Sequence, residues 1–247
     1  MNKVTEIIPA KEKWLCIVWQ VNDFCNFRCS YCNEGNWGGR FRHEDDIDKI
    51  LITLEHIIDL YPKDTEFVCI LNRKHHDETV IAGLLLRKLS EGSSIKVIDP
   101  HKLGPVHSVL QALNDIDDEE QVIVNYCDFS MYWDYNDFEE FVQQTECDGC
   151  VVCYTGFHPH MLGSDNYAFC KTVDNNQIVE IREKQPFTAD KMSEFASTGT
   201  YYFRKGSYIK KYFQQLIDED ININGEYYVS LVHNLLINDD MPNLVYE

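Results

Sequence analysis

The sequence lacks long apolar runs and has few positive charges. No run approaches the ~18 apolar residues of a membrane-spanning helix, and no signal peptide is apparent at the N-terminus. We therefore expect a cytoplasmic protein without a membrane partner. The 247 residues contain 22 Lys and Arg against 41 Asp and Glu, a formal net charge of -19. Such a charge repels nucleic-acid backbones, so we expect no nucleic-acid partner, and a nucleotide would need a local pocket or a divalent cation.

Internal repeats and low-complexity tracts are also absent, and the composition excludes a disordered chain. Hydrophobic residues make up 44% of the sequence and aromatic residues 13%, which is enough to bury the core of one large or two small domains. In the cytoplasm, the 10 cysteines are expected as reduced thiols or metal ligands, not disulfides. Their clustering is therefore more informative than their number.

Apolar patterns predict alternating strands and helices in the first half of the chain. Buried, often β-branched runs predict strands over residues 14–21, 66–71, 94–99 and 121–126. Helical patterns cover residues 45–60, 79–90 and 106–114. This alternation favours a mostly parallel sheet covered by helices on both faces.

The pattern changes from about Asp148. Strand-like segments follow one another at residues 150–156, 167–173, 177–183 and 198–204. Helices are expected after them, over 207–217 and 225–237. We therefore predict an α/β fold whose central sheet is mostly parallel and becomes mixed in this second part.

Three cysteines follow the first predicted strand at a spacing that suits an iron–sulfur cluster. Cys25, Cys29 and Cys32 could hold three irons of a four-iron cluster and leave the fourth open to a small ligand. The segment CNFRCSYC (25–32), with a strand upstream, resembles the cluster loop of radical S-adenosylmethionine enzymes. The resemblance covers residues 14–60 and implies a 4Fe-4S cluster and S-adenosylmethionine. The alternative is that three buried thiols pack in the turn between strand and helix.

The same resemblance has a limit, and a second cysteine group has a simpler explanation. The glycine-rich turn that radical enzymes carry after the next strand is replaced by EFVCILNRKHHDE (66–78).

Cys147, Cys150 and Cys153 form another triplet, but Cys150 and Cys153 lie on opposite faces of an apolar strand. We expect these thiols to pack in the core.

Two segments of the second part have the residue types of a nucleotide site. In DPHKLGPVHSVLQAL (99–113) a glycine turn precedes a helix, so backbone amides can approach a base or phosphate, although an ordinary helix start has the same pattern. VIVNYCDF (122–129) is a buried strand that ends in Asp128, at the edge where ligands of α/β proteins bind. A carboxylate there suits Mg²⁺, which fills its shell with phosphate oxygens, and a turn-capping aspartate is the alternative.

With EIREKQPF (180–187), ASTGTYYF (196–203) and INGEYYVSLVHNLL (223–236), these segments resemble the sugar-phosphate nucleotidyltransferases, which have a GT-A-like fold. The resemblance covers about residues 65–247. It implies a nucleoside triphosphate and a phosphorylated small-molecule acceptor as substrates, and activated sugars for surface polysaccharides as products. The implied nucleotide contacts are Gly104 and Pro105, and Asp128 is the implied Mg²⁺ ligand.

The resemblance also implies an acceptor site. Glu183 would accept a hydroxyl hydrogen bond and Lys184 would contact phosphate as a catalytic residue with Asp128, although a surface ion pair has the same sequence pattern. Thr198, Gly199 and Glu226 would complete the pocket. The segment YTGFHPHMLGSDNYAF (154–169) would form a lid from which His158 and His160 contact phosphate. A metal site at these histidines is less favoured, because the sequence shows no third ligand nearby.

The first strand–loop–helix unit departs from this family. The family begins with a Gly-x-Gly-x-Arg loop and a Pro-Lys pair that cradle the triphosphate, whereas here the cysteine loop follows the first strand. EGNWGGRF (34–41) is a faint substitute. We therefore divide the chain into a cysteine-loop segment, 1–62, and a nucleotidyltransferase-like domain, 63–247, which would make it a fusion.

Three hypotheses follow. The leading one is a magnesium-dependent nucleotidyltransferase in which a phosphorylated acceptor attacks a nucleoside triphosphate in line and releases pyrophosphate. The second is an iron–sulfur protein of the radical S-adenosylmethionine type. The third is a binding module for nucleotide sugars that has lost its triphosphate loop and its catalysis.

Overall fold

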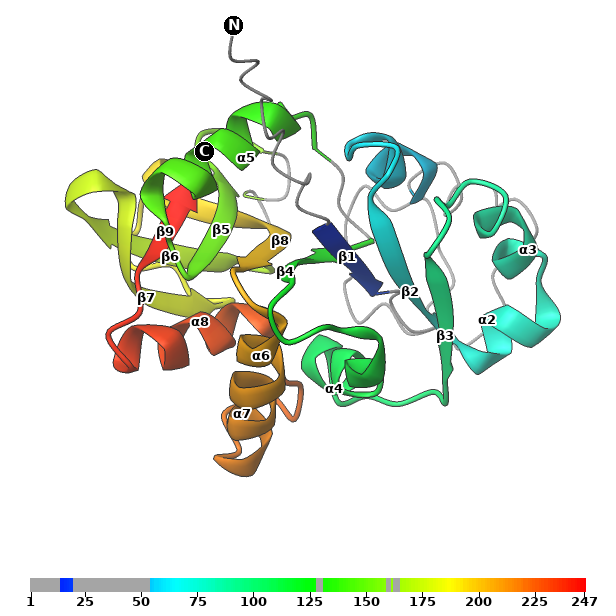
Figure 1. Cartoon of the computed structure of the whole chain (residues 1–247). Coiled ribbons are helices and arrows are strands. Elements are labelled where there is room, and N and C mark those ends of the chain that lie inside the picture. Colours follow the sequence, from blue (N-terminus) through cyan, green and yellow to red (C-terminus); the bar gives the residue numbers. More distant parts are fainter. Residues whose placement is uncertain (1–13, 20–53, 128–130, 159–160, 162–164) are drawn as a thin grey trace, which may run out of the picture.

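The computed structural model describes residues 14–19, 54–127, 131–158, 161 and 165–247. This part of the chain forms a nine-stranded sheet with the strand order β3-β2-β1-β4-β8-β5-β9-β7-β6 (Figure 1). The strands are β1 (Trp14–Trp19), β2 (Glu66–Asn72), β3 (Ser94–Ile98), β4 (Gln121–Tyr126), β5 (Gly149–Tyr154), β6 (Ala168–Val173), β7 (Gln177–Glu183), β8 (Phe195–Phe203) and β9 (Asn243–Tyr246).

Helices connect these strands. They are α2 (Arg73–Glu78), α3 (Ile81–Leu85), α4 (Pro105–Leu110), α5 (Tyr135–Thr145), α6 (Gly206–Tyr208), the π-helical η5 (Ile209–Phe213), α7 (Gln214–Asp218) and α8 (Val229–Asn238). Short 3-10 turns are η1 (Leu113–Asp115), η3 (Asp174–Asn176) and η4 (Lys191–Ser193). Residues 54–59 are also helical. Among the described helices, none has both the length and the apolar character needed to cross a bilayer.

The sheet has a parallel half and a mixed half. Strands β3, β2, β1 and β4 pair in parallel, as the alternating pattern predicted. Strand β8 then runs antiparallel to both β4 and β5, and β6 and β7 pair antiparallel. The prediction of an α/β fold with a sheet that becomes mixed is confirmed. The sheet as a whole is not mostly parallel, however, because β6, β7 and β8 pair antiparallel with their neighbours.

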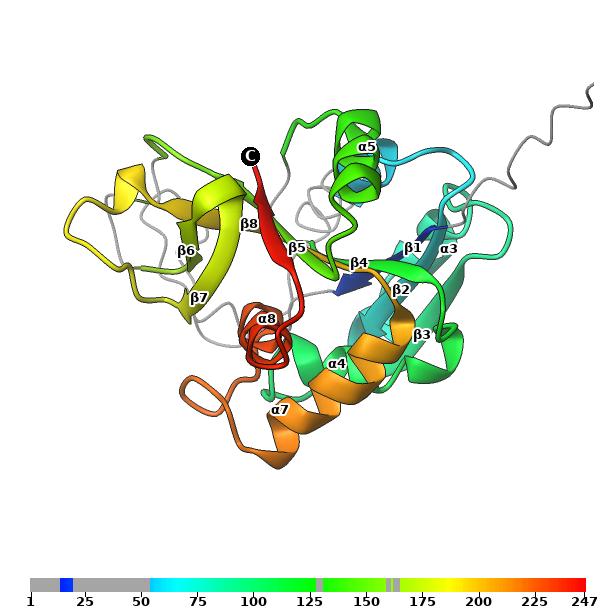
Figure 2. The same ribbon diagram turned by 60° about the vertical axis from the view of Figure 1, so that its left-hand side comes forward.

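Helices cover both faces of the sheet, and each layer has its own core. On one face α4, η5, α7 and α8 pack against a core that includes Val124, Val151 and Val229. On the other face the 54–59 helix, α3 and α5 pack around Phe67, Phe138 and their neighbours. Figures 1 and 2 show α5 on the opposite side of the sheet from α4, α7 and α8. Burial of one large apolar side chain stabilises such a core by about 1.5–3 kcal/mol.

Strand β1 lies inside this sheet. It pairs with β2 on one side and β4 on the other. Tyr61, in the predicted junction, donates a hydrogen bond to Asn125 Oδ1 at 3.1 Å, and Thr200 donates to the same oxygen at 2.9 Å. The division of the chain near residues 61–66 stays a prediction, but β1 and Tyr61 are both joined to β4.

Two predicted helices have different bounds in the structure. The pattern over 79–90 corresponds to α3 alone, preceded by α2, which begins earlier because Asn72 Oδ1 caps it by accepting from the Lys74 amide at 2.9 Å. The last helix begins at Val229, not at residue 225. Asn224 and Gly225 have φ values of 55° and 83°, which form a tight turn instead of a helical start.

Strand β9 was not predicted. It is four residues long, pairs in parallel with β5, and contacts β7 on its other side. Val245 is fully buried there. So short a run has too few residues to establish a period, which is why the pattern did not reveal a strand.

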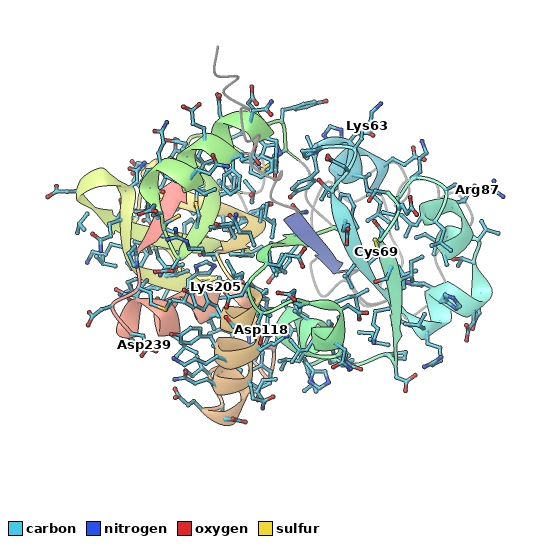
Figure 3. The ribbon with its side chains drawn as sticks, viewed as in Figure 1. Lys63, Cys69, Arg87, Asp118, Lys205 and Asp239 are labelled. Atoms are coloured by element: carbon cyan, nitrogen blue, oxygen red, sulfur yellow. The ribbon has the colours of Figure 1, made fainter. Side chains whose placement is uncertain are left out.

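Ion pairs hold the acidic segment before β4 against the α6–α7 helical stretch. Lys205 Nζ lies 2.6 Å from Glu119 Oε2, and Lys210 Nζ lies 2.5 Å from Asp118 Oδ1. Figure 3 labels Lys205 and Asp118 where this stretch meets α4. Exposed pairs of this kind each contribute about 1 kcal/mol or less. Gly206 provides a tighter contact, because a Cβ there would lie 2.0 Å from the Asp117 carbonyl oxygen.

Candidate functional site

Glu183 is a buried carboxyl group at the end of strand β7. It is 8% exposed, and Ser230 Oγ on α8 donates a hydrogen bond to its Oε2 at 2.6 Å. Burial raises the pKa of Glu183 from 4.5 to about 7, while the Ser230 hydrogen bond and the charge of Lys184 oppose that rise. The group can therefore gain or lose a proton near neutral pH. Such shifted groups are enriched at functional sites.

Lys184 follows in a backbone conformation that non-glycine residues rarely adopt. Its φ is 58°, and its amide donates to the Tyr167 carbonyl oxygen at 2.9 Å. Its ammonium donates to the Tyr228 hydroxyl, lies 4.4 Å from the centre of that ring, and lies 3.8 Å from Glu226 Oε2. Tyr228 in turn donates to Glu226. A positive-φ residue beside a buried carboxyl is typical of sites where the surroundings enforce strain.

The turn at residues 223–226 brings Glu226 to this cluster. Ile223 and Glu226 exchange two backbone hydrogen bonds, each at 3.0 Å, across Asn224 and Gly225. Asn-Gly favours this turn because both residues tolerate positive φ. The chain then reaches Tyr228, which precedes α8, so that the turn and the first turn of α8 face the end of β7 together.

Gly104 and Pro105 lie directly beside this turn. The Tyr227 amide donates to the Leu103 carbonyl oxygen at 2.9 Å, and the Val106 amide donates to the Tyr227 carbonyl oxygen at 3.1 Å. Gly104 has φ 85°, and a Cβ added there would lie 2.7 Å from both the amide nitrogen and the carbonyl oxygen of Tyr227. Pro105 is the first residue of α4 and is buried. The glycine is thus required for close packing, and its contact with a nucleotide stays a prediction.

Thr198 and Gly199 form a bulge in strand β8. The β5–β8 register moves from Val152↔Thr200 to Cys153↔Ser197, so Thr198 and Gly199 are extra residues on β8. Thr198 Oγ1 donates to the Val152 carbonyl oxygen at 3.0 Å. The Thr198 hydroxyl proton is therefore used within the sheet. Contact of Thr198 and Gly199 with an acceptor stays a prediction.

Tyr126, at the end of β4, connects this bulge to the Glu183 cluster. A Cβ at Gly199, which has φ 79°, would lie 3.1 Å from the Cβ of Tyr126. The Tyr126 hydroxyl accepts from the Val229 amide at 3.4 Å, at the start of α8. Burial raises the pKa of Tyr126 well above its usual value, and the charge of Glu183 adds to this rise. The structure therefore brings the ends of β4 and β7, the β8 bulge and the start of α8 together.

The rest of the predicted site is placed only in part. The His158 ring lies 5.7 Å from the Tyr154 ring and 6.5 Å from the Tyr167 ring, measured between centres. The Tyr167 carbonyl oxygen accepts from the Lys184 amide, so Tyr167 connects His158 to the cluster of Glu183, Lys184 and Glu226. His160 and the predicted Mg²⁺ ligand Asp128 lie outside the described residues.

The second cysteine triplet is buried, as expected. Cys150 packs in the core of one face of the sheet and Cys153 in the core of the other. Cys153 Sγ lies 3.8 Å from Cys170 Sγ, and burial raises the pKa of both Cys150 and Cys153. Within the described ranges, no group of three His, Cys, Asp or Glu side chains is arranged to hold a metal ion. Packing therefore explains these thiols.

The cysteine loop itself gives a separate prediction. Cys25, Cys29 and Cys32 lie outside the described residues, so the cluster stays a prediction from their spacing. If they bind a 4Fe-4S cluster, anaerobic reconstitution should give about four irons and four sulfides per chain. A triple Cys25→Ala, Cys29→Ala, Cys32→Ala variant should give none. Equal metal content in the two proteins would eliminate the cluster.

Sequence reasoning missed several residues of this site. Ser230, Tyr228 and Tyr126 each contact a predicted site residue or the start of α8. Ser230 and Glu183 are 47 positions apart in the chain, and no local pattern joins them. The available signal was the position of Ser230 within the apolar run of the last predicted helix, because a buried hydroxyl needs a hydrogen-bond partner.

Comparison with known proteins identifies the fold. No protein-family model and no curated protein sequence matches the chain. A nucleoside-diphosphate-sugar pyrophosphorylase from Vibrio cholerae RC9 matches in structure with a TM-score of 0.66 and 15% identity, over 94% of this chain and 91% of that one. The chain shares its fold. This match extends beyond about residues 65–247, on which the predicted resemblance rested.

Further structures agree on the fold. A UDP-glucose pyrophosphorylase complexed with UDP-glucose matches with a TM-score of 0.63 and 13% identity, over 95% of this chain and 91% of that one. HddC from Yersinia pseudotuberculosis matches with a TM-score of 0.54 and 13% identity, over 95% and 89% of the two chains. At such identities the likeness establishes the architecture, and activity has to be argued from the site.

Proposed function

We propose that this protein is a nucleotidyltransferase that joins a nucleotidyl group to a phosphorylated small molecule, such as a sugar phosphate. The observation that carries the proposal is the cluster of Glu183, Lys184 and Glu226 at the end of β7. Pyrophosphorylases of nucleotide sugars share the fold that positions this cluster. Activated sugars for surface polysaccharides would be the products.

Lys184 would bind the phosphate of the acceptor. Its side chain is only 18% exposed, and its ammonium is shared between Glu226 and the Tyr228 hydroxyl. A phosphate carries more negative charge than one carboxylate and offers several oxygens, so it can compete for the ammonium. Glu226 then loses part of its contact with Lys184 and is available to accept from a ligand hydroxyl. The site would thus exchange an internal ion pair for a ligand.

Glu183 would bind a hydroxyl group of the acceptor. Its buried carboxyl lies next to Lys184 in the chain and is oriented by Ser230. In the ionised form the carboxylate accepts from a hydroxyl, and a charge-assisted hydrogen bond of this kind is about twice as strong as a neutral one. Phosphate at Lys184 and hydroxyl at Glu183 together select a phosphorylated polyol, the chemical class to which sugar phosphates belong.

The nucleotide would lie beside Gly104 and Pro105. Asp128, two residues after β4, would hold Mg²⁺, which supplies neutralisation of the phosphate charges when bound. The acceptor phosphate oxygen would attack the α-phosphorus of the nucleoside triphosphate in line. A new P–O bond forms, the bond between the α-phosphorus and the bridging oxygen breaks, and pyrophosphate leaves with that oxygen. The contribution of Lys184 is to orient the attacking phosphate.

Replacing Lys184 with glutamine tests the acceptor site. Lys184→Gln keeps an unbranched polar side chain, one atom shorter, but removes the charge, so the Kd for glucose 1-phosphate or UDP-glucose should rise about 10- to 100-fold. Isothermal titration calorimetry measures this directly. Lys63→Gln is the control, because Lys63 is an exposed lysine remote from β7 (Figure 3). Equal affinity of wild type and Lys184→Gln, or no binding of either ligand to wild type, would contradict the proposal.

A binding module without catalysis is an alternative, for which the replaced first loop is the supporting feature. The Gly-x-Gly-x-Arg loop is replaced by the cysteine segment, so the triphosphate would lack its usual cradle. Such a module would bind UDP-glucose or a related nucleotide sugar and release no pyrophosphate from any nucleoside triphosphate. Protein-dependent pyrophosphate release would exclude it.

A further inference from the structure

Ser230 contacts one of the two carboxyl oxygens of Glu183. Ser230 is fully buried, in the first turn of α8, and its Oγ lies 2.6 Å from Glu183 Oε2. Within the described part of the chain, this is the hydrogen bond that the carboxyl group of Glu183 makes. A hydroxyl group can donate to a carboxylate and can also accept from a carboxylic acid. Ser230 can therefore hold Oε2 in both protonation states of Glu183.

Charged and titratable groups surround this contact on every side. Lys184 follows in the chain, and Glu226 approaches from the 223–226 turn; their charges lower and raise the pKa of Glu183, respectively. Besides burial, the charge of Glu183 raises the pKa of Tyr126 on β4 and of Tyr201 on β8, and Tyr228, before α8, contacts Lys184. Burial raises the pKa of Tyr126 and of Tyr201 well above the usual range, so both stay neutral near pH 7. Glu183 is thus the group that responds to a change at Ser230.

We propose that Ser230 is a positioning residue, which holds Oε2 of Glu183 and leaves the other carboxylate oxygen to accept a hydroxyl group of the phosphorylated acceptor. This inference rests on the proposed function for the role of Glu183 in binding. It assigns two effects to Ser230, of which Lys184 shares only the second, through its charge. Ser230 fixes the orientation of the carboxyl, and by donating to its ionised form it keeps that form populated near neutral pH.

The two effects have a common consequence for ligand binding. A carboxylate accepts from a ligand hydroxyl better than a carboxylic acid does, because a charge-assisted hydrogen bond is stronger. Burial has already raised the pKa of Glu183 to about 7, so about half of the protein carries the ionised form at pH 7. Without the Ser230 hydroxyl the ionised fraction falls further. The affinity of the site should then depend on pH more strongly than in wild type.

The first measurement needs no ligand. Carboxyl ¹³C resonances of glutamate-labelled protein are titrated, and the Glu183 resonance is identified by its loss in Glu183→Gln. Wild type should titrate near pH 7, and Ser230→Ala should titrate about one pH unit higher, because a hydrogen bond to a charged group has been lost. Ser230→Thr, which keeps a hydroxyl, should restore the wild-type midpoint. Ser93→Ala is the matched control, because Ser93 Oγ accepts from the Phe67 amide at 3.0 Å, far along the chain from β7.

The second measurement uses glucose 1-phosphate. At pH 7 a shift of one unit lowers the ionised fraction of Glu183 from about one half to about one tenth, so Ser230→Ala should bind about five-fold more weakly. Raising the pH to about 8.5 should recover most of the affinity. A loss of affinity that does not depend on pH would indicate a purely structural role and would overturn the proposal.

The outcomes separate this inference from the proposed function. An unchanged Glu183 midpoint in Ser230→Ala, or an equal shift in Ser93→Ala, overturns the role of Ser230 whatever the protein binds. A midpoint that rises in Ser230→Ala and returns in Ser230→Thr supports it. If that midpoint shifts while wild type fails to bind glucose 1-phosphate, the positioning of Glu183 by Ser230 is supported and the failure lies with the proposed acceptor.

Discussion

Replacing Gly104 with alanine is expected to lower the free energy of unfolding by about 2–4 kcal/mol and to weaken ligand binding. The added Cβ would lie 2.7 Å from two backbone atoms of Tyr227, so the backbone itself must move. Overpacking of this kind costs about 1–3 kcal/mol, and the backbone at φ 85° and ψ 179°, a region essentially restricted to glycine, adds at least about 1 kcal/mol. Because Tyr227 lies between Glu226 and Tyr228, its displacement also moves both residues that contact Lys184.

Gly225→Ala is the matched control for this variant. Gly225 has a similar φ of 83° and lies in the 223–226 turn, two residues before Tyr227, but a Cβ there has no atom within 4 Å. It should therefore cost only the conformational term, about 1 kcal/mol. Urea denaturation measures both. Equal destabilisation of the two variants would show that the contact with Tyr227 is not what requires glycine at position 104.

Replacing Glu183 with glutamine is expected to change how stability depends on pH. The pKa of Glu183 is raised from 4.5 to about 7 by burial, and the pKa of His233 is lowered from 6.5 to about 4 by burial in the core. His233 is fully buried, and its Nδ1 lies 2.9 Å from Asn243 Oδ1. Each shift of about 2.5 pH units corresponds to about 3 kcal/mol.

The two groups act in opposite directions. The stability that Glu183 contributes is fully present below pH 4.5 and is lost as the pH rises through about 7, because the folded state binds the proton more tightly. The stability that His233 contributes is present above pH 6.5 and is lost as the pH falls through about 4, because the unfolded state then binds the proton. Between about pH 4.5 and 6.5 their effects largely cancel.

Glu183→Gln removes one side of this balance. Relative to the variant, wild type should lose about 3 kcal/mol of unfolding free energy as the pH rises from about 4 to 8. Chemical denaturation of both proteins at several pH values measures the difference, in which the other titrating groups cancel. A difference that is constant across this range would mean that Glu183 is not buried as a proton-binding carboxyl.

The sequence predicted where several candidate residues lie relative to strands and helices, and their roles stay predictions. Glu183 is the last residue of a strand-like run and Lys184 follows it, and the predicted strand over 177–183 coincides with β7. Gly104 and Pro105 were located by the glycine turn before a helix, and α4 begins at Pro105. In each example a period of two, or a turn residue beside a helical pattern, was sufficient.

Contacts between distant segments could not be predicted in this way. The packing of Gly104 on Tyr227 joins residues more than 120 positions apart, and the contact of Tyr126 with Val229 spans 103 positions. Such pairs depend on the strand order of the sheet. Strand β8 lies between β4 and β5, which follow one another in the chain, and β9 lies between β5 and β7. Local patterns determine which segments are strands but leave the order of the strands open.

A thermal titration with each nucleoside triphosphate, with and without Mg²⁺, tests the central claim most directly. A ligand that binds only the folded state must raise its stability, by about 2.7 kcal/mol at a concentration 100 times its Kd. The account predicts that one nucleoside triphosphate raises the Tm of wild type in the presence of Mg²⁺ and that Gly104→Ala loses this response. No Mg²⁺-dependent rise with any nucleoside triphosphate would contradict nucleotidyl transfer by this protein.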